Sequence, residues 1–324
     1  MNAAKPLGLL LALVTGSVSA LSFDDYPAAR RFVGQMARRH GIEPGELTAA
    51  LQDAEIKTTI LEAMRRPAEG KPWPEYRKIF LTRKRIDRGV AFWKRHRAIL
   101  EQVQRTYGVP AQILVAILGV ETFYGTRTGS FRVLDALATL AFAYPRRTDF
   151  FRRELEQFFL LTREEGMDPR RPLGSYAGAM GWPQFMPSSY RRYAADFDGD
   201  GKRDIWNDPG DVIASIANYF VEHGWRKGEP VAVPLPKVAV ALADTGLEPR
   251  RTLGELKAQG LAGLDLPYPD SHKAVVMAFD GERGPEVWLG FPNFYVITRY
   301  NHSRLYAMAV YQLSEAIRSR IETP

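Results

Sequence analysis

Apolar residues recur three and four positions apart along most of this chain, a spacing typical of amphipathic helices that bury one face. Gly and Pro residues interrupt the pattern and mark the ends of the helices. Three prolines argue against regular structure between residues 67 and 76. The pattern predicts helices over residues 26–41, 43–66, 90–108, 111–125, 134–165 with an interruption at 144–151, 188–197, 208–224 and 303–321.

The pattern changes after residue 230, where short runs rich in β-branched and aromatic residues alternate with Pro, Gly and Asp. These runs predict strands within 230–242, 272–279 and 286–291. We therefore expect an α+β chain that is mainly α, with a small β-rich domain over residues 230–290. The last predicted helix should pack back on the helical part.

Composition narrows the possible functions. The chain has 324 residues and no cysteine, which excludes disulfides, thiolate catalysis, Cys-ligated metals and a lipidated cysteine. The net charge of +7 is modest, and without a nucleic-acid-binding motif the sequence predicts no nucleic-acid partner. Basic and apolar residues alternate at helical spacing over 83–97, which predicts a solvated helix face.

Residues 1–20 have the features of a secretory signal peptide. Lys5 precedes a Leu-rich run, and Val18 and Ala20 occupy the small-residue positions before a cleavage site. The apolar run is shorter than the roughly 20 residues that span a bilayer, and no later run reaches that length. We therefore predict an exported protein that is cleaved after Ala20. A signal that stays uncleaved as an anchor is the alternative.

Glu121 follows an apolar run from Ile113 to Val120, on a predicted helix that is apolar nearly all round and therefore buried. Burial disfavours the charged form of a carboxyl, so the pKa of Glu121 should be raised. A general acid is kept protonated near neutral pH in this way. A structural role for the carboxyl is equally compatible with this pattern.

The segment 174–190, GSYAGAMGWPQFMPSSY, combines glycines that permit close backbone approach with aromatic, hydroxyl and amide side chains. Sugars are bound by this mixture, because aromatic faces stack on C–H surfaces while polar groups pair with ring substituents. An aromatic-rich loop without a ligand has the same composition.

The segment DFDGDGKRDIWND resembles the calcium loop of an EF-hand between two predicted helices. Its Gly201 matches the sharp turn at position six, but position twelve is Asn207 instead of Glu. We expect a slightly expanded loop that binds a structural Ca²⁺, and a metal-free loop of Asx turns is the alternative. The predicted metal-site residues are Asp196, Asp198, Asp200, Lys202, Asp204 and Asp208.

Together these segments resemble the lytic murein transglycosylase B family. The resemblance rests on GVETFYG, LDALATLAFAYPRR, GSYAGAMGWPQFMPSSY, DFDGDG followed by ANYF, and GFPNFYVITRYNHS, in that order. It runs from Tyr76 to the C-terminus and implies a lysozyme-like catalytic core, an added helical domain and a small β domain. The implied division is a signal peptide 1–20, a helical domain 21–106, the core 107–229 with a helical insertion at about 145–170 and the EF-hand-like loop 196–208, the β-rich domain 230–290, and a C-terminal segment 291–324.

The resemblance also assigns residues. It implies that Glu121 is the single catalytic acid/base. One tyrosine of the family is Phe150 here, which removes a hydroxyl, and the family's lipidated cysteine is absent, so no lipid anchor and a soluble periplasmic form are expected. The implied substrate-binding residues are Ser175, Gln184, Asn301, Tyr76, Tyr219, Tyr300, Tyr306, Arg146 and Arg147.

The implied reaction is cleavage of the MurNAc–GlcNAc β-1,4 bond in peptidoglycan glycan strands. One carboxyl suffices when the N-acetyl oxygen of the substrate assists, and attack by the MurNAc C6 hydroxyl then gives a 1,6-anhydro product. No catalytic cofactor is implied, and other cell-wall enzymes are candidate partners. A muramidase that admits water and a non-catalytic wall-binding protein are the alternatives.

Overall fold

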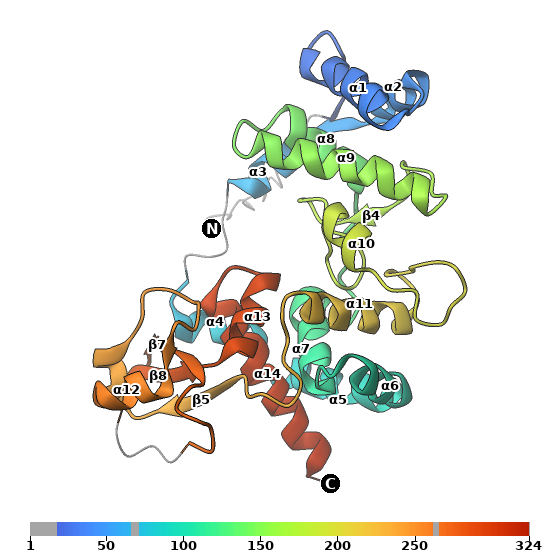
Figure 1. The fold of residues 1–324 in the computed structure, drawn as a ribbon. Coiled ribbons are helices and arrows are strands. Elements are labelled where there is room, and N and C mark those ends of the chain that lie inside the picture. The colour runs from blue at the N-terminus through green and yellow to red at the C-terminus, as the bar shows by residue number, and fades with distance from the viewer. Residues whose placement is uncertain (1–17, 66–70, 262–265, 324) are drawn as a thin grey trace, which may run out of the picture.

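The computed structural model describes residues 18–65, 71–261 and 266–323. Helices dominate and lie in an upper and a lower group, and a small sheet flanks the lower group (Figure 1). Within the described residues, no helix is both long and apolar enough to span a bilayer. Residues 1–17, which carry most of the predicted signal peptide, lie outside the described part.

The upper group joins N-terminal helices to helices from the middle of the chain (Figure 1). Phe32 of the first helix packs 6.0 Å from Phe142 and 6.3 Å from Phe159, measured between ring centroids. These contacts tie the N-terminus to the predicted insertion. The helices of this group are α1 (Pro27–His40), α2 (Pro44–Asp53), α3 (Thr58–Met64), α8 (Val133–Phe142), α9 (Thr148–Glu164) and α10 (Pro187–Tyr193).

A short ladder joins β1 (Val18–Ala20) to β2 (Glu55–Lys57) in antiparallel register. The buried Asp135 of α8 accepts a hydrogen bond from the backbone N–H of Glu55 at 3.0 Å, so β2 is fixed to α8 as well as to β1. Cleavage after Ala20 would remove β1 and leave the bonds from β2 to α8 in place.

The lower group surrounds α7 (Ala111–Thr122), the helix that the sequence predicts to be buried. Nine of its residues are buried, which matches an apolar helix enclosed on all sides. Its neighbours come from both halves of the chain (Figure 1). The other helices of the group are α4 (Trp73–Phe80), α5 (Arg83–Arg95), α6 (Arg97–Tyr107), α11 (Pro209–Glu222), α13 (Pro292–Tyr300) and α14 (Arg304–Glu322).

Three predicted elements differ in detail. The helix expected over 90–108 breaks at His96, whose backbone leaves the helical region between α5 and α6. The expectation of irregular structure up to residue 76 is wrong from Trp73 onward, because Pro74 lies in the first turn of α4, where its missing N–H costs no hydrogen bond. Residues 43–66 form two helices separated by β2 instead of one.

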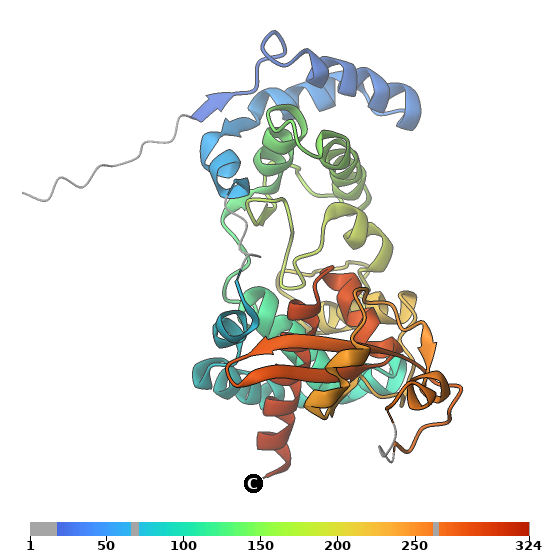
Figure 2. The same cartoon turned by 90° about the vertical axis from the view of Figure 1, so that its left-hand side faces the viewer.

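The remaining strands form a sheet in the order β5-β8-β7-β6, and the β7–β8 hairpin runs across the front of Figure 2. The run over 230–242 is only partly a strand, since Pro234 and Pro236 have no N–H to continue the edge of the sheet, and a 3₁₀ helix (Lys237–Leu242) follows. The strands and associated helix are β5 (Ala232–Leu235), β6 (Arg251–Thr252), α12 (Leu253–Ala258), β7 (Lys273–Gly281) and β8 (Gly284–Gly290), and a separate pair joins β3 (Phe131–Arg132) to β4 (Leu173–Gly174).

The packing crosses the domain limits expected from the resemblance. Helices α4 and α5, and all of α6 except its last residue, fall inside the expected unit 21–106, yet they contact helices of the lower group and the sheet. Trp73 of α4, for example, lies 5.2 Å from Phe279 of β7, measured between ring centroids. Glu121 is therefore held by packing from both ends of the chain.

Candidate active site

Glu121 lies in the last turn of α7, and the first turn of α14 brings Tyr306 to it. The Tyr306 hydroxyl donates a hydrogen bond of 2.5 Å to Glu121 Oε1. Ser303 begins α14 by accepting a hydrogen bond from the Tyr306 backbone N–H, which fixes the start of that helix and the place of the tyrosine. Glu121 as a residue is half-buried, and its carboxyl is enclosed by the surrounding protein.

The surroundings of Glu121 favour its protonated form. Burial raises the pKa of the carboxyl to about 7, and the hydrogen bond from Tyr306 opposes this shift in part. Burial also raises the pKa values of Tyr300 and Tyr306 well above the usual value, so both phenols stay protonated. Near neutral pH the site holds an acid that can give up one proton and take it back.

The turn after Glu121 is unusual, because Phe123 and Tyr124 both have positive φ angles, of 52° and 62°. The Tyr124 hydroxyl donates to the Arg85 carbonyl at 2.8 Å and fixes this turn against α5. Gly119 makes the contact possible, since a Cβ atom there would lie 2.7 Å from the Tyr124 hydroxyl oxygen.

The segment 174–190 lies beside this turn and is attached to it by hydrogen bonds. Thr122 Oγ1 donates to the Trp182 carbonyl at 3.1 Å, and Gln184 Nε2 donates to the Thr128 carbonyl at 3.1 Å. Ser175 Oγ accepts from the backbone N–H of Ala179 at 3.0 Å. Ser175 and Gln184 thus give the segment its shape, whatever contacts they make with substrate.

Further tyrosines form a cluster near the carboxyl, and the Glu121 charge acts on the phenol of Tyr300. Tyr300 donates from its hydroxyl to the Pro183 carbonyl at 2.6 Å, and its ring centroid lies 4.9 Å from that of Tyr219. The Tyr219 hydroxyl donates to the Arg299 carbonyl at 2.6 Å. Tyr76 interacts electrostatically with Tyr306. Asn301, half-buried, follows directly at the end of α13.

Arg146 and Arg147 lie elsewhere, on the turn between α8 and α9. The Arg147 guanidinium lies 4.3 Å above the ring centroid of Phe150. The contacts of Arg147 therefore remain within the upper group. Among the described contacts, none joins either arginine to Glu121.

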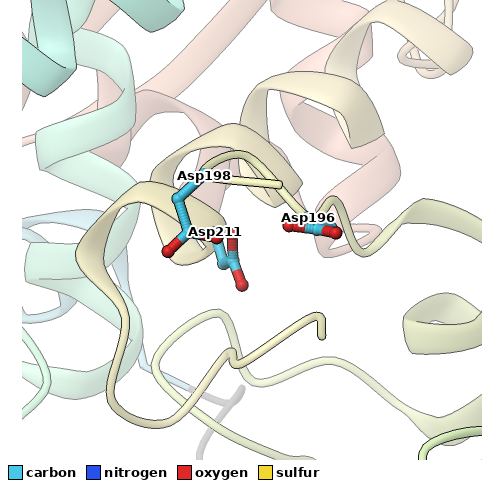
Figure 3. A group of neighbouring side chains, drawn as sticks. All are labelled: Asp196, Asp198 and Asp211. Atoms are coloured by element: carbon cyan, nitrogen blue, oxygen red, sulfur yellow. The ribbon is translucent and has the colours of Figure 1, made fainter. Parts of the chain in front are cut away.

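The aspartate loop holds a cluster of carboxylates. One oxygen each from Asp196, Asp198 and Asp211 lie within 4.8 Å of one another, and Figure 3 shows these side chains beside the start of α11. Carboxylate oxygens at this spacing fit a hard cation such as Ca²⁺. Burial, with the nearby charges of Asp208 and Asp198 as smaller contributions, raises the pKa of Asp211, although two backbone N–H groups oppose the shift.

All five aspartates that the sequence predicts as metal ligands accept backbone hydrogen bonds. Asp208 accepts a hydrogen bond from the Asp211 N–H at 2.9 Å as the N-cap of α11, and Asp204 accepts from the Trp206 and Asn207 N–H groups, both at 2.9 Å. Asp200 accepts from the backbone N–H of Lys202 at 2.8 Å. Asp211 was missed because it lies beyond the twelve-residue loop, in the first turn of the next helix.

The aspartate loop is also joined to the segment beside Glu121. The Trp182 N–H donates to the Ile205 carbonyl at 2.9 Å, and a Cβ atom on Gly181 would lie 2.4 Å from that oxygen. Trp182 in turn accepts the bond from Thr122, the neighbour of Glu121. A cavity of about 790 Å³ is lined by residues of this loop together with Trp206 and Leu173, and Glu121 is not among its lining residues.

Comparison with known proteins identifies the family. Residues 24–315 match the model of the transglycosylase SLT domain. The chain is also 44% identical over 305 residues to the membrane-bound lytic murein transglycosylase B of Escherichia coli K12, a match that spans 91% of this chain and 84% of the relative. The chain belongs to the lytic transglycosylase family.

The transglycosylase is also similar to solved structures of the family. It is similar to the soluble lytic transglycosylase SltB1 from Pseudomonas aeruginosa, with 52% identity, a TM-score of 0.84 and coverage of 91% of this chain and 99% of that one. It is similar also to the Escherichia coli lytic transglycosylase Slt35, solved in complex with calcium, with 42% identity, a TM-score of 0.83 and coverage of 97% and 99%.

These similarities confirm two predictions from the sequence. The transglycosylase has the mainly helical, lysozyme-like fold, and it is a peptidoglycan lytic transglycosylase. Glycan strands of peptidoglycan are therefore its binding partner. The catalytic and metal-binding roles of single residues remain predictions that rest on the geometry above.

Proposed function

We propose that the transglycosylase cleaves the MurNAc–GlcNAc β-1,4 bond with Glu121 as its single acid/base. The observation that supports this is the Glu121 carboxyl itself, bonded to Tyr306 and with its pKa raised by burial to about 7. A carboxyl with this pKa is protonated often enough to act as an acid, and its anion is basic enough to take the proton back.

The first step uses the protonated carboxyl. Glu121 gives its proton to the glycosidic oxygen, the bond from C1 to that oxygen breaks, and the carbonyl oxygen of the MurNAc N-acetyl group bonds to C1. The leaving glycan departs as an alcohol. The positive charge of the cyclic intermediate balances the negative charge that remains on Glu121.

The second step uses the carboxylate. Glu121 takes the proton from the C6 hydroxyl of the same MurNAc, the C6 oxygen bonds to C1, and the bond from C1 to the N-acetyl oxygen breaks. The Tyr306 hydroxyl bonds to the carboxylate and stabilises it between the two steps. No water is consumed, so the products should carry a 1,6-anhydro ring at their MurNAc ends. Products with reducing ends would contradict the proposal.

Calcium belongs to the proposal as a structural ion. Asp196, Asp198 and Asp211 would hold it, with Asp200 and the carbonyl of Lys202 as further oxygen ligands of the loop. The relative solved with calcium makes this ion the first to test. Bound in the loop, the cation would offset the mutual repulsion of these carboxylates.

The melting temperature should be higher with added calcium than with a chelator, because an ion that binds only the folded state stabilises it. At a concentration 100 times the Kd the gain is about 2.7 kcal/mol, or roughly 4 °C for a chain of this size. Asp198→Ala should abolish the shift, and Asp25→Ala, an exposed carboxyl elsewhere, should retain it. Equal melting temperatures of the wild type in both conditions would exclude the site.

We also propose that the protein acts in the periplasm after cleavage of its signal peptide. The cell wall lies in that compartment, and the N-terminal pattern supports export. The absence of cysteine leaves no residue for a lipid anchor, and other cell-wall enzymes remain candidate partners.

A further inference from the structure

Three arginine side chains surround one aromatic ring beside the active site. The Cζ atoms of Arg85, Arg88 and Arg127 lie 5.1, 4.8 and 5.2 Å from the ring centroid of Phe123. Phe123 follows Glu121 by two positions, in the turn between α7 and the segment that contacts Gln184. Helix α5, which carries Arg85 and Arg88, packs against α7 in the lower group (Figure 1).

Arg85 has a structural role. It is 8% exposed, its Nε donates to the Gly119 carbonyl at 3.0 Å, and a second nitrogen donates to the carbonyl of Ile79. The solvated face expected for residues 83–97 is therefore wrong at this position, because the guanidinium turns inward to satisfy helix ends. Burial, with the charge of Arg127 as a smaller contribution, lowers the pKa of Arg85, and the charge of Tyr124 opposes the shift.

Arg88 and Arg127 differ from Arg85 because both are exposed. Other arginines of the same basic run do have acidic partners, for example Arg97, which bonds to Glu101 at 2.8 Å. Over residues 18–65, 71–261 and 266–323, no carboxylate pairs with Arg88 or Arg127. Three like charges around one ring, with no anion to offset them, form a site that favours an anionic ligand.

The cluster is connected on two sides to residues that surround Glu121. The Arg127 N–H donates to the Thr122 carbonyl at 2.9 Å, and the next residue, Thr128, accepts the bond from Gln184. On the other side, the Arg85 guanidinium lies 5.1 Å from the ring centroid of Phe80, which packs 5.2 Å from the ring of Tyr76. The ring on which both exposed guanidinium groups stack thus belongs to the turn that directly follows Glu121.

We propose that Arg88 and Arg127 bind a carboxylate of the peptide stem carried by the glycan strand that is cleaved at Glu121. A guanidinium group matches the two oxygens of a carboxylate, and stacking on Phe123 holds both groups in place before the ligand arrives. The stem is attached to MurNAc, the sugar whose C1 reacts, so its carboxylates are carried close to the bond that is cleaved. The inference rests on the proposed function of Glu121 and adds a preference for stem-bearing strands.

The test compares two substrates, glycan strands that carry their stems and strands from which an amidase has removed them. The double variant Arg88→Gln and Arg127→Gln should lose roughly 10- to 100-fold in kcat/KM on stem-bearing strands, the effect expected for charged hydrogen bonds. Its kcat/KM on stem-free strands should be unchanged. Activity on stem-free strands also tests Glu121 separately from this site.

A matched control removes two positive charges from elsewhere on the neighbouring helices. Arg95 and Arg105 are exposed on α5 and α6, and Arg95→Gln with Arg105→Gln should leave kcat/KM unchanged on both substrates. Arg127→Gln alone should show part of the loss on stem-bearing strands. This single variant tests the proposal even if the double variant does not fold. An equal loss on both substrates, or no loss on stem-bearing strands, would overturn the proposal.

Discussion

Replacing Glu121 by glutamine is expected to reduce turnover of cell walls by at least 10²- to 10⁴-fold, the range roughly attributable to a positioned acid/base. Glutamine keeps the shape of the side chain and can still accept the bond from Tyr306, but it has no proton to give. Clearance of a cell-wall suspension measures the loss. Glu222→Gln, which removes an exposed carboxyl at the end of α11, should retain full activity, and near wild-type clearance by Glu121→Gln would reject the assignment.

The same variant should be more stable than the wild type at alkaline pH, and this separates lost chemistry from lost folding. The pKa of Glu121 is about 7 in the folded protein and 4.5 without the fold. The stability that this group contributes is complete below pH 4.5 and is lost as the pH rises through about 7. The free energy of unfolding, measured by thermal unfolding, should therefore be larger for Glu121→Gln than for the wild type at pH 8, by up to about 3 kcal/mol. At pH 4 the two should not differ.

Removal of the Tyr306 hydroxyl should have the second largest effect. In Tyr306→Phe the carboxylate formed between the two steps loses a hydrogen bond to a charged group, which costs roughly 10- to 100-fold in rate. The same bond lowers the pKa of Glu121 in the wild type, so its loss raises that pKa above about 7. The alkaline limb of the kcat/KM profile should accordingly move to higher pH.

Tyr311→Phe is the matched control, because Tyr311 lies on the same helix and its hydroxyl donates to the Ala232 carbonyl instead. Its alkaline limb should coincide with that of the wild type. If the limb of Tyr306→Phe also stays in place while its rate falls, Tyr306 acts on the substrate and not through Glu121.

The central feature of the site could be predicted from local sequence. The apolar run before Glu121 predicts a buried helix, and α7 is enclosed by helices from both ends of the chain. Burial then sets the direction of the pKa shift without further knowledge of the structure. Other features required the resemblance, because Tyr306 is 185 positions from Glu121 and nothing local to either residue indicates their contact.

Features that depend on tertiary contacts were missed. Asp211 reaches the aspartate cluster because α11 starts immediately beside the loop, and the spacing rule for an EF-hand does not extend that far. Arg85 turns inward because carbonyl groups at the ends of α4 and α7 need donors, which a helical pattern does not record. The 3₁₀ helix after β5 follows from two prolines whose effect depends on their place at a sheet edge.

The products formed in water labelled with heavy oxygen test the central claim most directly. Mass spectrometry of a wild-type digest should find fragments that end in 1,6-anhydroMurNAc, each lighter by one water than a hydrolysis product and free of the label. Intramolecular attack on C1 requires this result. Labelled reducing ends as the main products would show that water attacks C1, and the proposed second step at Glu121 would be wrong.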